Sequence, residues 1–293
     1  MDRVLSNKKA ICFFILPAFI IFVAIIIFPI IMSGYYSTLN WDGIGKSTFA
    51  GIENYTRLFT SSEDGFVESI KNSVILAFLS VFVQLPIALI LALVLSNGVK
   101  GENFYRSVYF IPVIVSTVVI GQLWMKIYHP SYGLLNTFLR NVGLDSLTRE
   151  WLGSTDTALG AVFVPVVWQY IGYHMLLMYA AIKSISTDII EAAKIDGANA
   201  VQTAFKITIP LILPILEVCV TFAVIGSLKT FDLIYVLTGG GPIHATEVPS
   251  TLMFNTIFHK YMYGYGSAMA IFIIAECLVL TVVIQRLFRL NKA

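Results

Sequence analysis

The chain has 293 residues, of which 57% are hydrophobic and 12% are charged, and its mean hydropathy is +0.82. Soluble domains carry about 25% charged residues, so this composition excludes a soluble protein, and we expect no nucleic-acid partner. The net charge of +2 says little by itself. Three cysteines all fall in apolar segments, where a thiol acts as a small apolar filler, so they predict neither a disulfide framework nor a metal site.

Six apolar segments are long enough to cross the hydrocarbon layer, which takes roughly 20 helical residues. Backbone polar groups have no water to bind in lipid, so each segment is predicted to be a helix. We therefore predict an all-α integral membrane protein with a short N-terminal segment, 1–9, and a membrane domain, 10–293. The expected spans are 10–32, 73–96, 107–127, 158–182, 211–237 and 267–288.

Basic residues indicate the orientation. With both termini in the cytoplasm, the inner segments hold 11 Lys and Arg and the outer segments hold 5, as the positive-inside rule favours. Lys8 and Lys9 precede the first span, as basic residues precede the apolar core of a signal peptide. The apolar run is too long for a signal peptide and has no small-residue cleavage site, so we expect an uncleaved helix.

A polar stretch at residues 191–214, EAAKIDGANAVQTAFKITIPLILP, lies between the fourth and fifth spans. Asp188 and Glu191 have the spacing of an N-cap and its reciprocal partner. Gly197 is placed to end a first helix in a left-handed conformation, and Asn199 to cap a second. Pro210 then disfavours continuation of the second helix. We predict a helix, a glycine turn and a second helix on the cytoplasmic side.

Ionisable residues within the fifth and sixth spans are functional candidates, because each is costly in lipid. Lys229 and Asp232 are three residues apart and can pair on one helix, while Glu217 and Glu276 can bond between helices. We interpret His174, in the fourth span, as a hydrogen-bonded packing histidine.

No nucleotide-binding motif is visible. Residues 45–48 read GKST, like the end of a phosphate-binding loop, but Asn40 stands where that motif requires a glycine. ATP-driven work would therefore need another subunit.

Two motifs carry a family resemblance. The pattern EAAxxDGAxxxxxxFxxxIPxxxP at 191–214 resembles the cytoplasmic signature loop of permease subunits of binding-protein-dependent ABC importers. The run FDxIYxLTGGGP at 231–242, followed by Ala245 and Thr246, resembles the first of the two permeases in maltose and multiple-sugar systems. The maltose subunit's additional N-terminal spans and large periplasmic domain have no counterpart in this sequence.

The resemblance implies a type I ABC importer permease, not an enzyme, in a bacterial or archaeal cytoplasmic membrane. It implies a second permease subunit, giving a heterodimer, two ATP-binding subunits that hold ATP and Mg, and an extracytoplasmic solute-binding protein; this chain would bind no cofactor itself. Coupling to the ATPase would occur in the loop 183–210, through Glu191, Ala192, Ala193, Asp196, Gly197 and Ala198.

The same resemblance places a sugar pocket. Thr117 and Tyr173 match a hydroxyl and an aromatic lining position of the maltose subunit. The other lining positions carry changed side chains, so the ligand is expected to differ: Val113, Gln169, Tyr170, Gly226, Lys229 and Thr230.

Three alternatives stay open. The same architecture can import a polyol or glycerol phosphate, since Lys229 suits an anion. A secondary transporter would need no ATPase, which the 191–214 motif argues against. A membrane enzyme would depend on His174, for which the sequence offers no catalytic partner.

Overall fold

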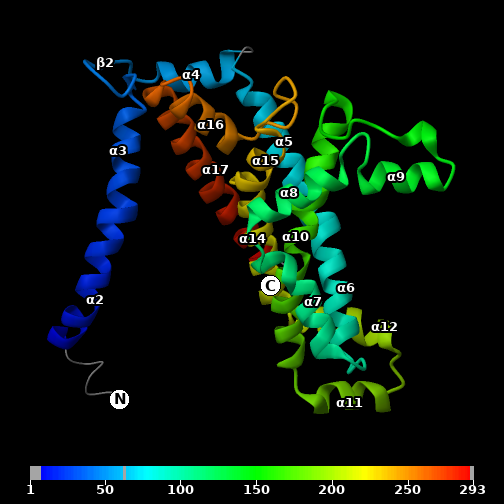
Figure 1. Cartoon of the computed structure of the whole chain (residues 1–293). Helices are drawn as coiled ribbons and strands as arrows, with labels where there is room; N and C mark the ends of the chain where they lie inside the picture. The colour runs from blue at the N-terminus through cyan, green and yellow to red at the C-terminus, as the bar shows by residue number, and fades with distance from the viewer. Residues whose placement is uncertain (1–7, 62–63, 291–293) are drawn as a thin grey trace. The chain divides into compact units, whose positions relative to one another are not determined.

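The computed structural model of the chain describes residues 8–61 and 64–290, and these are almost entirely helical (Figure 1). Within the described ranges the strands are β1 (Leu39–Asn40) and β2 (Thr48–Phe49), an antiparallel pair with Leu39 opposite Phe49. The chain divides into two compact units. The first takes in residues up to Asp64 and Met253–Ala275, and the second takes in Gly65–Leu252 and the residues from Glu276 onward.

Five helical segments are long and apolar enough to cross a membrane, and a bent helix pair brings the number to six if it is one span. Each corresponds to one predicted span, which confirms the all-α membrane fold. The five are Phe13–Tyr36, Phe66–Ser96, Thr155–Lys183, Leu213–Thr238 and Tyr263–Arg289, and the pair is Glu102–Ile114 with Thr117–Ile127.

The first unit is built from the first span and from elements that pack through polar contacts. Asn54 is buried and its amide nitrogen donates to the carbonyl oxygens of Ser37 and Leu39 at 2.9 and 2.8 Å. Arg57 donates to Asp64 at 2.8 Å, and its guanidinium lies 4.4 Å from the centre of the Tyr265 ring. The unit comprises α2 (Lys8–Phe22), the π-helix η1 (Val23–Ile27), α3 (Phe28–Tyr36), α4 (Glu53–Thr60), most of α16 (Pro249–Phe258) and the first half of α17 (Tyr263–Leu290).

The second unit packs around α10 (Thr155–Lys183), the longest helix of the described chain. One apolar cluster includes Leu76, Val162 and Ile234, and another includes Ala92 and Met175. The surrounding elements are α5 (Phe66–Leu79), η2 (Ser80–Gln84), α6 (Leu85–Ser96), α7 (Glu102–Ile114), α8 (Thr117–Ile127), α9 (Leu134–Asn141), η3 (Asp145–Leu147), α11 (Thr187–Ile195), α12 (Ala200–Thr203), η4 (Ala204–Thr208), α13 (Ile209–Leu211), α14 (Leu213–Leu228) and α15 (Asp232–Thr238).

Gly172 sets the distance between α10 and α7. A Cβ at this position would lie 1.9 Å from the carbonyl oxygen of Tyr109 and 3.1 Å from the Cα of Phe110. Because these are backbone atoms, no rotamer change can relieve the contact. The close approach of the two helices therefore requires glycine.

Two predicted spans are not continuous helices. The third bends by 96° between α7 and α8, where Val115 is extended and Ser116 is also non-helical. Pro112 removes one backbone donor from the last turn of α7, which weakens the helix just before the bend. The fifth is interrupted at residues 229–231, where Phe231 has φ −141° and ψ −63°.

Candidate functional site

A cavity of about 480 Å³ lies within the second unit. Residues of η2, α7, α8, α10, α14 and α15 line it, together with residues 229–231 between α14 and α15. All eight residues predicted as pocket positions are in its wall: Val113, Thr117, Gln169, Tyr170, Tyr173, Gly226, Lys229 and Thr230.

Both helix interruptions supply this wall. The bend at residues 115–116 puts Thr117 at the first position of α8, and the interruption at 229–231 contributes Lys229 and Thr230. Non-helical backbone at membrane depth is tolerated where it is buried in protein or lines a wet cavity. The interruptions therefore belong to the architecture of the cavity.

The wall combines aromatic faces with separate polar groups. Tyr170, Tyr173 and Phe222 line it, and the Tyr173 and Phe222 rings have centroids 6.5 Å apart. Ser80 and Ser227 also line it and share a hydrogen bond of 2.9 Å between their hydroxyl oxygens. An arrangement of this kind suits a ligand with apolar faces and hydroxyl groups.

In the described part of the chain, the pairing of Lys229 with Asp232 that their spacing allowed is not formed. The helix ends at Leu228 and restarts at Asp232, so the two residues are not on consecutive turns of one helix. No ion pair joins them among the residues that the structure describes. Both side chains instead line the cavity.

His174 also lines the cavity, which corrects the interpretation of it as a hydrogen-bonded packing residue. Its side chain is buried, and its Nδ1 atom has no hydrogen-bond partner in the described part of the chain. Gln84 and Phe222 are further lining residues that the sequence did not reveal. Each is an isolated polar or aromatic residue in an apolar helix, and no local pattern distinguishes it from packing.

The loop at 183–210 has the predicted helix, turn and helix. Gly197 has φ +83°, and it ends α11 with a bond from its N–H to the Lys194 carbonyl at 3.1 Å and one from Ala198 to Ala193 at 2.9 Å. These two bonds form the Schellman arrangement. Asn199 caps α12, and its reciprocal partner is Gln202, with both bonds at 2.9 Å.

The predicted start of the first loop helix is wrong by two residues. Ser186 is the N-cap, and its hydroxyl accepts from the Asp188 N–H at 3.3 Å. Asp188 therefore lies in the first turn, where the positive end of the helix dipole stabilises its carboxylate.

The predicted end of the second loop helix is also wrong. Helical backbone passes through Pro210 to Leu211, because the π-helical turn at 204–208 widens the helix just before the proline.

The loop exposes the residues of its signature. Glu191, Ala192, Asp196 and Gly197 are exposed, Ala198 is half-buried, and Ala193 is buried at 5%. Large apolar side chains next to them are also exposed: Ile195 at 86%, Val201 at 66% and Phe205 at 68%. An exposed apolar surface beside polar residues is typical of a protein contact site.

A cluster of charged and aromatic groups joins the start of α7 to the end of α10, just before this loop. Lys183 lies 3.6 Å from Glu102, and Tyr179 donates a hydrogen bond to Glu102. The Arg106 guanidinium lies 4.6 Å from the centre of the Tyr179 ring. The loop therefore begins at a fixed point on the helices that line the cavity.

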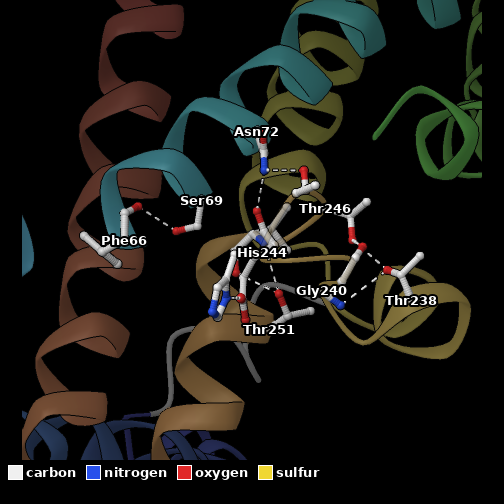
Figure 2. Close-up of polar contacts among 12 residues, drawn as sticks. Phe66, Ser69, Asn72, Thr238, Gly240, His244, Thr246 and Thr251 are labelled. Atoms are coloured by element: carbon white, nitrogen blue, oxygen red, sulfur yellow. Dashed lines mark hydrogen bonds and ion pairs between the residues drawn. The ribbon is translucent and has the colours of Figure 1, made fainter. Parts of the chain in front are cut away.

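The TGGGP segment after α15 is held in place by hydrogen bonds (Figure 2). Asn72 of α5 donates to the carbonyl oxygens of Glu247 at 2.8 Å and Ala245 at 3.2 Å. Thr246 bonds the Thr238 hydroxyl at 2.7 Å, while His244 contacts the buried Glu247 carboxylate. This segment is thus a fixed part of the second unit.

Interrupted membrane spans around a cavity, together with an exposed two-helix loop, define a multi-pass transport permease. The chain belongs to the family of binding-protein-dependent transport system inner membrane components, whose sequence model matches residues 84–291. It is a permease subunit of an ABC importer, as the 191–214 motif predicted.

Permease proteins of several ABC transport systems match nearly the full chain. The probable ABC transporter permease protein YurN of Bacillus subtilis is 37% identical over 98% of both chains. The trehalose/maltose transport system permease protein MalF of Thermococcus litoralis is 35% identical over 95% of this chain and 93% of that protein. The sn-glycerol-3-phosphate transport system permease protein UgpA of Brucella abortus is 30% identical over 96% and 95%.

The fold matches a solved transporter. A chain in the crystal structure of a bacterial ABC transporter involved in import of the acidic polysaccharide alginate superimposes with a TM-score of 0.84, at 24% identity, over 98% of this chain and 97% of that one. A chain in the crystal structure of a bacterial alginate ABC transporter in complex with an alginate pentasaccharide-bound periplasmic protein also superimposes with a TM-score of 0.84, at 24% identity.

Proposed function

We propose that this permease passes a sugar or oligosaccharide, delivered by an extracytoplasmic solute-binding protein, across a bacterial or archaeal cytoplasmic membrane. The observation that supports this most directly is the convergence of all eight candidate residues on one cavity. The matching trehalose/maltose permease supports a carbohydrate as the solute class.

The cavity chemistry suits a sugar. The faces of Tyr170 and Tyr173 can stack on the apolar face of a sugar ring, while Gln169 and Thr117 can bond its hydroxyl groups. The unpartnered Nδ1 atom of His174 is a further group that a hydroxyl can satisfy.

The loop 183–210 is the proposed contact with one of two ATP-binding subunits, which hold ATP and Mg. Exposed Ile195 and Phe205 would supply the apolar contact and Glu191 a polar one. With both termini cytoplasmic, closure of the ATPases would move the loop and rock the helices, giving alternating access with a second permease subunit. This chain would bind no cofactor itself.

Import of glycerol phosphate is the second candidate. Lys229 lies in the cavity wall with no ion pair among the described residues, and such a cation can hold a phosphate. The matching sn-glycerol-3-phosphate permease makes this a specific alternative.

Solute uptake into proteoliposomes containing the complete transporter tests the proposal. Tyr173→Ala should lower uptake strongly while ATP hydrolysis continues, because a stacking face is lost but the loop is unchanged. Lys229→Met separates the two candidates: uptake of a neutral sugar should fall little, whereas uptake of an anion should be nearly abolished. Unchanged uptake with Tyr173→Ala would contradict the proposed site.

A further inference from the structure

A second hollow, the lateral groove, has a volume of about 690 Å³ and is separate from the transport cavity. It lies between the end of α8, the start of α9 and the first turns of α10, all within the second unit. Its walls are mainly apolar and aromatic, with Trp124, Tyr128, Phe138 and Trp151 among them.

The floor of the lateral groove is one face of α10. Thr157, Gly160, Ala161 and Val164 have the spacing of neighbours on a helix surface, and all four line the groove. A Cβ added to Gly160 would meet no atom within 4 Å. The small residues Gly160 and Ala161 therefore leave open space along this face of α10.

The aromatic wall is fixed by a buried amide. The Trp151 indole N–H donates to the Asn136 side-chain oxygen at 2.8 Å, and the Asn136 nitrogen donates to the carbonyl oxygens of Pro130 and Arg149 at 3.0 and 2.9 Å. Asn136 is 2% exposed. The polar atom of Trp151 is thus satisfied within the protein, which leaves the ring as groove wall.

Exposed apolar side chains lie on all three helices that form the groove. Leu134 and Phe138 of α9 are 70% and 61% exposed, and Leu123 of α8 and Val164 of α10 are 48% and 53% exposed. Tryptophan and tyrosine beside such a surface are typical of the level where hydrocarbon meets water. An amphipathic helix that exposes leucine and phenylalanine there is stable when its apolar face meets lipid.

We infer that the lateral groove binds the acyl chain of a phospholipid in the leaflet opposite the loop 183–210. The groove opens on α10 near its N-terminal end, whereas that loop follows the other end of the same helix. An acyl chain matches the apolar walls, and Asp156 and Thr157 are the polar members of the lining. The acyl chain would lie along the α10 face that contains Gly160, against the Trp151 ring.

Photolabelling tests this inference. The complete transporter is placed in nanodiscs with a phospholipid that carries a diazirine in its acyl chain, irradiated, and mapped by peptide mass spectrometry. Labels are expected in residues 134–164, and Gly160→Leu should reduce them several-fold because its side chain fills the groove. Gly160→Ala, a smaller filling, should give a smaller reduction.

Gly226→Leu is the matched control, since Gly226 also has open space around a built Cβ but lies in the transport cavity. Its labelling of 134–164 should equal that of the wild type. Equal labelling in Gly160→Leu would overturn the inference. So would cross-linking of the groove residues to another subunit in place of lipid, because a protein segment would then occupy the groove.

Discussion

Three glycines show how one residue type has three different functions in this chain. Gly197 supplies a positive φ, Gly172 permits close backbone contact, and Gly160 leaves space. The conformation at Gly197 was predictable from its place after a helical stretch, because the αL end of a helix favours glycine. The role of Gly172 depends on Tyr109, which is distant in sequence, and the role of Gly160 depends on open space in the folded chain, so the sequence did not reveal either role.

Gly197→Ala should impair coupling. Its built Cβ meets nothing within 4 Å, so the effect is that of the backbone, about 1–2 kcal/mol for a non-glycine residue in the left-handed region. We expect lower solute uptake at normal expression, with Gly197→Asn partly retaining function because asparagine tolerates this conformation better. Wild-type uptake in both variants, measured in proteoliposomes, would show that the turn is not required.

Gly172→Ala should destabilise the fold. The added methyl group meets the Tyr109 backbone, and overpacking of this kind costs about 1–3 kcal/mol. The thermal unfolding midpoint of the detergent-solubilised complex should fall. Gly160→Ala provides the control, because the same change in the same helix enters open space; equal midpoints for the two variants would contradict the packing argument.

At the scale of elements, Asp64 joins α4 to the start of α17 within the first unit. It accepts from Arg57 at 2.8 Å and from the Tyr265 hydroxyl at 3.2 Å. Burial alone would raise the pKa of Asp64, but hydrogen bonds from Arg57 and Ser61 and the Arg57 charge together hold it below its usual value. The ionised carboxylate therefore contributes to stability.

The contribution of Asp64 should depend on pH. Because its folded-state pKa is lowered, the stabilisation is complete above the unfolded-state pKa, about 3.9, and is lost as pH falls through the folded-state pKa. Asp64→Asn should lower the thermal midpoint at neutral pH, and the difference from the wild type should shrink in acid. Glu68→Gln is the control: the Glu68–Lys71 pair is exposed and should contribute little at any pH. A difference between Asp64→Asn and wild type that is independent of pH would contradict this account.

The elements themselves were largely predictable. Apolar length indicated all six spans, and Asn199 was correctly assigned as a cap because its side chain acts locally. The interruptions at 115–116 and 229–231 were missed, because both fall in segments that remain apolar enough to read as single helices. The cavity positions came from the family resemblance, and no spacing in the sequence alone would have brought Thr117 and Tyr173 together.

At the scale of the whole molecule, the loop 183–210 lies in sequence between two helices that line the cavity. α10 contributes Gln169, Tyr170 and Tyr173 to the cavity and ends at Lys183, where the loop begins. α14 follows the loop and leads to Gly226 and Lys229. A displacement of the loop can therefore be transmitted to the cavity wall through α10 and α14. This connection is the structural basis of the proposed coupling.

The measurement that tests the central claim most directly is the composition of the native complex. The tagged chain is extracted gently from its own membrane with its neighbours, and the proteins that co-purify are identified by mass. We expect an ATP-binding subunit and a second six-span permease in the same complex. Replacing Gly197 by alanine and Glu191 by glutamine should reduce recovery of the ATP-binding subunit and leave recovery of the second permease unchanged. Recovery of the chain alone, under conditions that preserve other membrane complexes, would contradict the account and indicate a transporter that works without an ATPase.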